Sequence, residues 1–251
     1  MITEKSTVEE IRQRFDAEVD CYSNLETGQV ATVDAPLTMS LVAEAAAVTT
    51  PHAKELLDVG CGGGNYSLKL LQRFPNLNVT LVDLSQEMLD CAVSRVQPQT
   101  TGTVTAIHSD MREMILGEQR FDIIVASATL HHLRTDDEWR TVFQKFFAAL
   151  KPSGSIWIFD LIESPIPEIQ AIHWRRYGEY LTSVGGESYR DELFERIIRE
   201  DTPRPIVFQL DLLREVGFRE VEILHKHACF LHACFGERGG VSPPVCFRGC
   251  P

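Results

Sequence analysis

Residues 56–65 read LLDVGCGGGN, and the organisation of the whole chain follows from this stretch. An apolar run that ends in an acid and a glycine-rich turn predicts a strand, a tight loop and the start of a helix. Because Gly60, Gly62 and Gly64 carry no side chains, a ligand can lie directly against the backbone of this loop. The carboxylate of Asp58 at the end of the strand favours a ligand with an ammonium group over the pyrophosphate of a dinucleotide.

The spacing of these glycines separates two kinds of nucleotide-binding loop. Gly60, Gly62 and Gly64 follow one another at intervals of two, whereas dinucleotide loops carry the pattern G-x-G-x-x-G. Asp83, after the next apolar run, does not discriminate, because dinucleotide sites also place an acid after the second strand. A nucleotide-dependent oxidoreductase is therefore the minor alternative, and Cys61 is interpreted as a small buried side chain and not as a nucleophile.

Further landmarks follow this loop at regular intervals. In order, the landmarks are DVGCGGG at 58–64, Asp83 after the apolar run 79–82, HSDM at 108–111, FDIIVAS at 121–127 and LKPSG at 150–154. Together they resemble the motifs of the class I S-adenosylmethionine (SAM)-dependent methyltransferases, over roughly residues 40–235. The resemblance implies an α/β fold with a Rossmann-like seven-stranded sheet, mostly parallel with a terminal antiparallel strand and with helices on both faces. It also implies SAM as the cofactor and methyl transfer to a small organic acceptor.

The same resemblance assigns the cofactor site. Asp58 would face the amino-acid part of SAM, Asp83 would hold the ribose hydroxyls, and Asp110 would lie beside the adenine. The residues expected around the cofactor are Asp58, Gly60, Cys61, Gly62, Asp83, Leu84, Asp110, Met111 and Ser127. His131 and His132 are the candidate catalytic bases, because they follow the fourth strand of the family and imidazole titrates near neutral pH. Alternatively, they only shape the pocket.

One subgroup of the family is more similar than the rest. Phe15-Asp16, Tyr22-Ser23-Asn24 and LREVGF at 213–218 resemble the carboxy-SAM synthases of tRNA wobble-uridine modification. In those enzymes an arginine shortly before the terminal Gly-Phe holds the extra carboxylate. Here Leu212 stands near that place and Arg214 lies two positions away. Carboxy-SAM synthesis is therefore a second interpretation, and a SAM-binding protein without turnover is a third.

The composition excludes several other functions. The formal charge of −12 argues against a nucleic-acid partner, because binding to phosphates depends on lysine and arginine. Apolar runs stay shorter than the roughly 18 residues that span a bilayer, and residues 1–5 do not resemble a signal peptide. We therefore expect a cytoplasmic protein without a membrane partner, in which the seven cysteines are reduced thiols.

Three parts are predicted along the chain. Residues 1–50 form an N-terminal helical cap, residues 51–236 form the methyltransferase domain, and residues 237–251 form a tail that is predicted to be disordered. The segment 163–205 within the domain carries prolines, aromatic residues and arginines, and it is predicted to be a helical insertion. This insertion either covers the acceptor as a lid or forms the interface of a homodimer.

The cap is predicted to begin with an amphipathic helix over residues 6–20, with Ser6 as its N-cap and Glu9 completing a capping box. Such a helix often covers the cofactor in this family, although an ordinary helix packed on the sheet fits the pattern equally well. The residues that would face the ligand are Arg14, Phe15, Tyr22 and Ser23.

Strands and helices alternate along the domain, which predicts a parallel sheet with helices on both faces. The predicted strands are 55–59, 78–82, 103–107, 121–126, 154–160, 218–227 and 229–235. The predicted helices are 37–48, 65–74, 86–96, 136–150 and 208–216.

A last pattern concerns metal ligands. His225, His227 and Cys229 alternate along one predicted strand, so their side chains share a face and could converge on a metal ion. They lack the paired C-x-x-C spacing of a structural zinc site. Core or pocket residues are the favoured interpretation, and no metal is expected.

Overall fold

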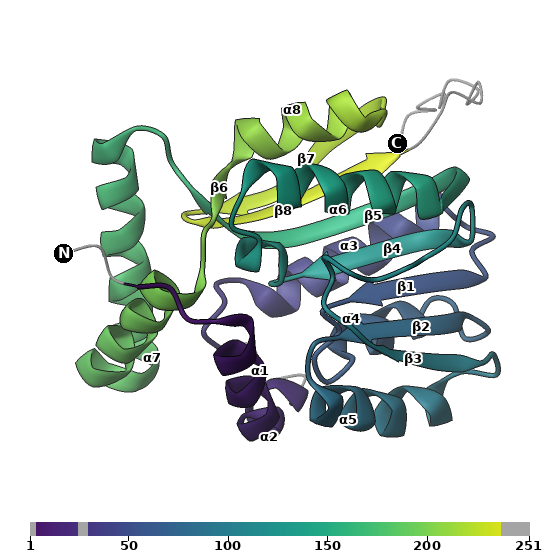
Figure 1. Ribbon diagram of the computed structural model, residues 1–251, viewed down its shortest axis with the longest axis horizontal. Coiled ribbons are helices and arrows are strands. Elements are labelled where there is room, and N and C mark those ends of the chain that lie inside the picture. The colour runs from purple at the N-terminus through teal and green to yellow at the C-terminus, as the bar shows by residue number, and fades with distance from the viewer. Residues whose placement is uncertain (1–3, 25–29, 237–251) are drawn as a thin grey trace, which may run out of the picture.

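A mixed sheet lies at the centre of the computed structural model, which describes residues 4–24 and 30–236 (Figure 1). The predicted tail at 237–251 lies outside the described residues. Seven of the eight strands follow the order β3-β2-β1-β4-β5-β8-β7, and the short β6 pairs with β5 beside this path. The strands are β1 Glu55–Val59, β2 Asn78–Asp83, β3 Val104–His108, β4 Phe121–Ser127, β5 Leu150–Glu163, β6 Arg204–Pro205, β7 Glu220–His227 and β8 Phe230–Gly236.

Strand directions agree with the predicted fold class. β1 to β5 pair in parallel, and β8, the last strand of the described residues, runs antiparallel to both β5 and β7. The Rossmann-like α/β fold, mostly parallel with an antiparallel final strand, is therefore confirmed. In space β8 lies inside the sheet, and β7 forms the edge.

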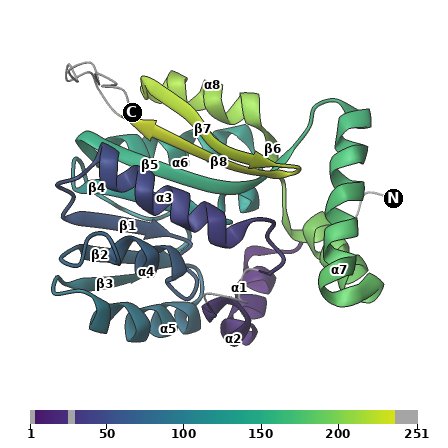
Figure 2. The same ribbon diagram turned by 180° about the vertical axis from the view of Figure 1, so that it is seen from behind.

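Alternating apolar side chains on the central strands create two cores. Leu56 and Ile123 point into one core, whereas their chain neighbours Leu57 and Ile124 point into the other, because successive residues of a strand face opposite sides. Helices α3, α4 and α5 cover the first face, and α6 and α8 cover the second, as Figures 1 and 2 show. The helices are α1 Val8–Ala17, α2 Val19–Ser23, α3 Ala35–Thr49, α4 Asn65–Leu71, α5 Gln86–Val96, α6 Asp136–Ala149, α7 Pro167–Glu200 and α8 Ile206–Val216.

Most predicted elements lie within a few residues of the observed ones, but the start of α1 is different. Thr7, and not Ser6, is the N-cap: its hydroxyl accepts a hydrogen bond from Glu10 N at 3.2 Å, and Glu10 Oε2 accepts one from Thr7 N at 2.7 Å. The predicted capping box Ser6–Glu9 is therefore wrong by one residue. Both pairs fit the motif, and Ser6 N instead donates to Arg199 O at the end of α7.

The segment 163–205 contains a long helical element that stands outside the main sheet layers. The helical backbone of α7 is interrupted at Gly186, which has φ 85° and ψ 179°. In both views α7 lies beyond the same end of the sheet as α1 and α2 (Figures 1 and 2). Among the described residues no helix has both the length and the apolar character needed to cross a membrane.

Burial in the centre of the sheet predicts a clear difference between two isoleucines. Ile124 in β4 is 0% exposed and Ile115 is 90% exposed. We expect Ile124→Ala to lower the free energy of unfolding by about 2–5 kcal/mol, because a buried cavity adds to the lost transfer energy. Ile115→Ala should change it by less than about 0.5 kcal/mol. Urea denaturation of both variants measures this, and equal losses would contradict the assigned core.

Candidate functional site

A crevice opens beyond the carboxyl ends of β1, β2 and β4, where open α/β sheets bind ligands. The cavity volume of the crevice is about 150 Å³. Each residue predicted to surround the cofactor contributes to its lining: Asp58, Gly60, Cys61, Gly62, Asp83, Leu84, Asp110, Met111 and Ser127. The fold therefore brings this whole predicted set to one place, although their contact with a cofactor stays a prediction.

The glycine loop depends on the absence of a side chain at Gly60. This residue has φ +63°, and a Cβ atom on it would stand 2.3 Å from Thr129 Oγ1. Gly60 N and Cys61 N both donate to Val82 O, at 2.8 and 3.1 Å, which attaches the loop to the end of β2. The backbone can therefore approach a ligand in the crevice closely.

Asp83 joins the end of β2 to the glycine loop. Its Oδ2 accepts a hydrogen bond from Gly62 N at 2.8 Å, and its Oδ1 accepts one from Ser85 N at 2.9 Å. Burial raises the pKa of Asp83 although these backbone bonds act in the opposite direction. A carboxylate offers about four acceptor positions, so this one can accept further hydrogen bonds from a ligand.

Asp58 is the second acid of the crevice, and it is only 1% exposed. Its Oδ2 accepts hydrogen bonds from Ser67 Oγ at 2.6 Å and from Ser67 N at 3.2 Å. Burial raises the pKa of Asp58 to about 6, and the negative charge of Asp83 acts in the same direction. A positively charged ligand group beside this carboxylate would favour its ionised form.

Asp110 differs from the other two acids because an arginine neutralises it. Arg112 Nη2 lies 2.7 Å from Asp110 Oδ2, and Arg112 N donates to Asp110 Oδ1 at 2.8 Å. Arg112 Nη1 also donates to His132 O at 3.2 Å. Arg112 was not among the residues predicted from the sequence, although the D-x-R spacing is visible there.

The N-terminal helices border the crevice. Phe15 and Tyr22 contribute to its lining, and Asn65 Nδ2 on α4 donates to Tyr22 O at 3.0 Å. Arg14 and Ser23 do not line it: Arg14 Nη2 instead pairs with Glu200 Oε2 at 2.6 Å. Of the four residues predicted to face a ligand, Phe15 and Tyr22 line the crevice, and their contact with a ligand stays a prediction.

The two candidate histidines lie on the 3-10 turn Leu130–His132 and have different surroundings. His131 does not line the crevice. Its Nδ1 hydrogen-bonds to Asp160 Oδ1, and its Nε2 lies 3.7 Å from Asp201 Oδ1. Burial opposes protonation of His131, but Asp201 and Asp160 outweigh it and raise its pKa to about 9. His131 is therefore an imidazolium at neutral pH.

His132 is buried and does line the crevice. Burial lowers its pKa well below the ordinary value, and the charges of His131 and Arg14 lower it further. Its Nδ1 lies 3.3 Å from Asp201 Oδ1, yet this atom has no hydrogen-bond partner among the described residues. His132 is therefore a neutral imidazole at the wall of the crevice.

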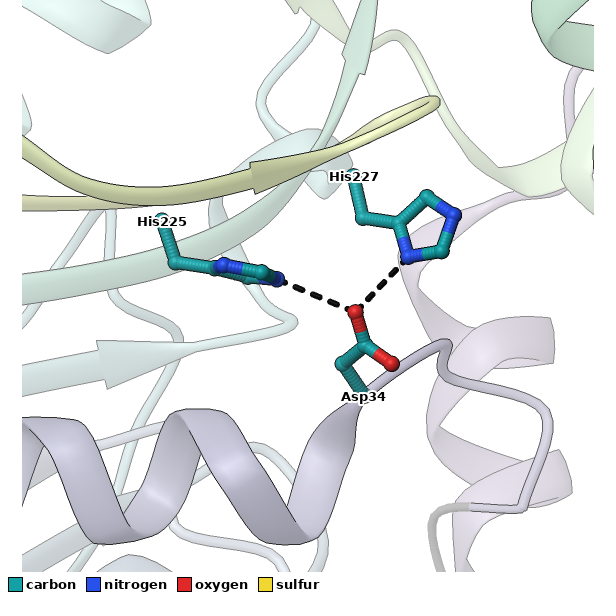
Figure 3. A group of neighbouring side chains, drawn as sticks. All are labelled: Asp34, His225 and His227. Atoms are coloured by element: carbon teal, nitrogen blue, oxygen red, sulfur yellow. Dashed lines mark hydrogen bonds and ion pairs between the residues drawn. The ribbon is translucent and has the colours of Figure 1, made fainter.

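The third predicted constellation is only partly assembled. Cys229 is buried in an apolar core. His225 and His227 instead meet Asp34, which precedes α3 (Figure 3). The strand pattern thus predicted the shared face of the two histidines but not their partner.

Because burial raises the pKa of Asp58, replacing this acid with a neutral residue should stabilise the protein at pH 7.5 more than at pH 4. Because its pKa is about 6 in the folded state and about 3.9 in an unfolded chain, the protein without ligand loses stability as the pH rises from about 4 to about 6. Asp58→Asn should therefore raise the free energy of unfolding by about 1–3 kcal/mol at pH 7.5 and by much less near pH 4. Thermal denaturation at both pH values tests this, and a variant that is less stable at pH 7.5 would contradict it.

Comparisons with known proteins agree with this geometry. Residues 56–154 match the family model described as a methyltransferase domain. The malonyl-[acyl-carrier protein] O-methyltransferase of Priestia megaterium is 28% identical over 137 residues, which are 53% of this chain and 47% of that protein. The chain thus spans about half the length of this relative.

Two solved structures share the fold. Human N-acetylserotonin methyltransferase in complex with SAM has a TM-score of 0.56 at 18% identity, over 92% of this chain and 56% of that one. The [4+2]-cyclase SpnF has a TM-score of 0.63 at 14% identity, over 95% of this chain and 99% of that one. The motifs, the matched domain and the methyltransferase relatives together support a class I SAM-dependent methyltransferase.

Proposed function

We propose that the chain is an enzyme that binds SAM in the crevice and transfers its methyl group to a small organic acceptor. One observation carries this proposal: two buried acids and a bare glycine loop lie in the same crevice as the neutral imidazole of His132. The relatives support methyl transfer in general but name different acceptors, since one is named for malonyl-[acyl-carrier protein] and another for N-acetylserotonin.

The acids of the crevice fit the parts of SAM. Asp83 keeps acceptor positions free beside the glycine loop, which suits the two ribose hydroxyls. Asp58 is buried at the end of β1, where the ammonium group of the cofactor would favour its ionised form. Arg112 neutralises Asp110, which leaves a pair without net charge beside the uncharged adenine. SAM supplies a reactive methyl group on a sulfonium, so the protein has to position the acceptor and remove its proton.

His132 is the proposed general base. A neutral imidazole can accept a proton from an acceptor hydroxyl or amine, and the carboxylate of Asp201, 3.3 Å away, offsets part of the repulsion between the resulting imidazolium and His131. His131 acts as a positioning residue, because Asp160 holds its ring and its backbone N–H donates to Asp160 Oδ2 at 3.0 Å. Its carbonyl also accepts a hydrogen bond from Thr202 N at 2.7 Å, which connects the histidine turn to the end of α7.

The apolar wall of the crevice restricts the acceptor. Val8, Ile11 and Phe15 of α1 line it together with Tyr22. We assign acceptor selection to this wall, which suits a molecule with an apolar body and one ionisable oxygen or nitrogen. The insertion acts indirectly: Tyr177 and Tyr180 of α7 donate to Ala31 O and Val30 O, both at 2.8 Å, and Ala31 lines the crevice.

Carboxy-SAM synthesis finds less support. Leu212, near the place of the carboxylate-binding arginine, is buried in the core. Arg214 pairs with Asp211 at 3.2 Å, and neither residue lines the crevice. Arg112 does line it, but its guanidinium is engaged by Asp110.

Methyl transfer is therefore the favoured chemistry, and a panel of small alcohols, amines and carboxylic acids incubated with SAM tests it. Release of S-adenosylhomocysteine with one of these acceptors supports methyl transfer. If the protein binds SAM but releases no S-adenosylhomocysteine with any acceptor of the panel, methyl transfer is rejected.

Asp83→Asn should weaken SAM binding by roughly 10- to 100-fold, because a hydrogen bond to a charged group contributes about 1.5–3 kcal/mol. The asparagine still offers an oxygen to one of its two backbone donors, Gly62 and Ser85, so the fold should persist. Calorimetric titration measures the affinity, and the exposed Asp90→Asn is the matched control. Equal affinities of the two variants would refute the ribose assignment.

His132→Gln should lower kcat/KM by about 10²- to 10⁴-fold, the usual contribution of general acid–base catalysis. Its SAM affinity should stay close to that of the wild type, because the assigned role concerns the acceptor. Release of S-adenosylhomocysteine with a responsive acceptor measures the rate, and the exposed His52→Gln serves as control. If His132→Gln keeps full activity, His132 is not the general base and only lines the crevice.

A further inference from the structure

Three potential metal ligands meet at the edge of the sheet, away from the proposed reacting centre. His225 Nε2 lies 3.0 Å and His227 Nδ1 lies 2.7 Å from the same oxygen, Oδ2 of Asp34 (Figure 3). One ligand atom from each residue lies within 4.8 Å of the others. Residues separated by 191 and 193 positions in the chain are thus brought to one point.

The local backbone directs these three side chains toward one another. His225 and His227 are two residues apart on β7, so they share a face of this edge strand. Lys226 between them points to the other face, and its Nζ donates to Ala228 O at 3.1 Å. The two imidazoles therefore face Asp34 without an interposed lysine.

Asp34 has an unusual conformation for the residue that precedes a helix. It occupies the N-cap position of α3, where an aspartate normally accepts a hydrogen bond from its own helix, yet its side chain makes no such bond. Its backbone is left-handed, with φ 60°, a conformation that residues other than glycine rarely adopt. The carboxylate instead lies between the two histidines (Figure 3).

We propose that Asp34, His225 and His227 bind one zinc ion, with water as the fourth ligand. Two imidazoles and one carboxylate form a donor set that zinc commonly accepts. Ligand atoms of a tetrahedral zinc site lie roughly 3.3 Å apart, so the observed 2.7 and 3.0 Å require only a small outward movement of the side chains. The side chain of His227 is 51% exposed, which leaves room for this movement and for the water.

The bound ion would stabilise the segment 31–34, of which Ala31 and Thr32 line the crevice. Asp34 follows Ala31 and Thr32, which line the crevice, while Tyr177 and Tyr180 hold the same segment from α7. A zinc ion would attach this segment to β7 as well. The inference does not depend on methyl transfer, because it rests on residues outside the crevice lining.

Zinc titration of the whole 251-residue chain, untagged, purified without chelator and then stripped of metal, tests the proposal. We expect one zinc ion per chain, and we expect His227→Ala and Asp34→Asn each to weaken binding by at least roughly 100-fold. His52→Ala, at an exposed histidine in the turn after α3, is the matched control and should bind like the wild type. Circular dichroism of the variants confirms that they fold.

A second titration separates this site from the cluster of His131, His132 and Asp201, whose potential ligand atoms also lie close together. His132→Gln should leave zinc affinity unchanged, and zinc should raise the melting temperature of this variant but not that of His227→Ala. Absence of zinc binding by the wild type, or binding that His132→Gln removes and His227→Ala retains, would overturn the proposal.

Discussion

Two buried carboxylates at neighbouring strand ends are the constraint on which the site depends. β1 and β2 pair in parallel, so Asp58 and Asp83 emerge at the same edge of the sheet. Burial raises the pKa of both acids, and their negative charges disfavour each other. The backbone N–H groups of Gly62 and Ser85 partly compensate the negative charge of Asp83. Among the described residues, the carboxylate of Asp58 accepts hydrogen bonds from Ser67 alone. The crevice thus favours a ligand that is positively charged near Asp58 and rich in donors near Asp83.

Helix α1, which borders the crevice, is connected to the histidine turn Leu130–His132 through charged residues at the end of α7. Arg14 of α1 pairs with Glu200, and Arg196 pairs with Glu18 at 3.1 Å. The next residue, Asp201, lies beside both histidines. A shift of α1 would therefore disturb the residues that set the protonation of the turn. These contacts link the end of α7 to the histidine turn, although among the described residues no side chain of α7 lines the crevice.

Sequence patterns predicted the sheet and the residues that line the crevice because both follow local rules. Glycines with positive φ and acids at strand ends are visible in a short window, and alternation places them at one edge. The partners Asp160, Asp201 and Asp34 were missed, because each meets its histidine only through long-range packing. For His225 and His227, strand periodicity predicted the shared face, but the element that packs across this face cannot be read from spacing. Cys229, two residues further, lies in the core instead.

The two neighbouring histidines of the turn, His131 and His132, differ in protonation state because their surroundings differ. Their ring centroids lie 4.4 Å apart, so protonation of both would place two buried positive charges in contact. Asp160, which is 0% exposed, hydrogen-bonds to the ring of His131 and not to the ring of His132, and together with Asp201 it favours the proton on His131. The charge on His131 then helps to keep His132 neutral. Two buried acids, Asp160 on β5 and Asp201 after α7, therefore divide one His-His sequence into a protonated and a neutral imidazole.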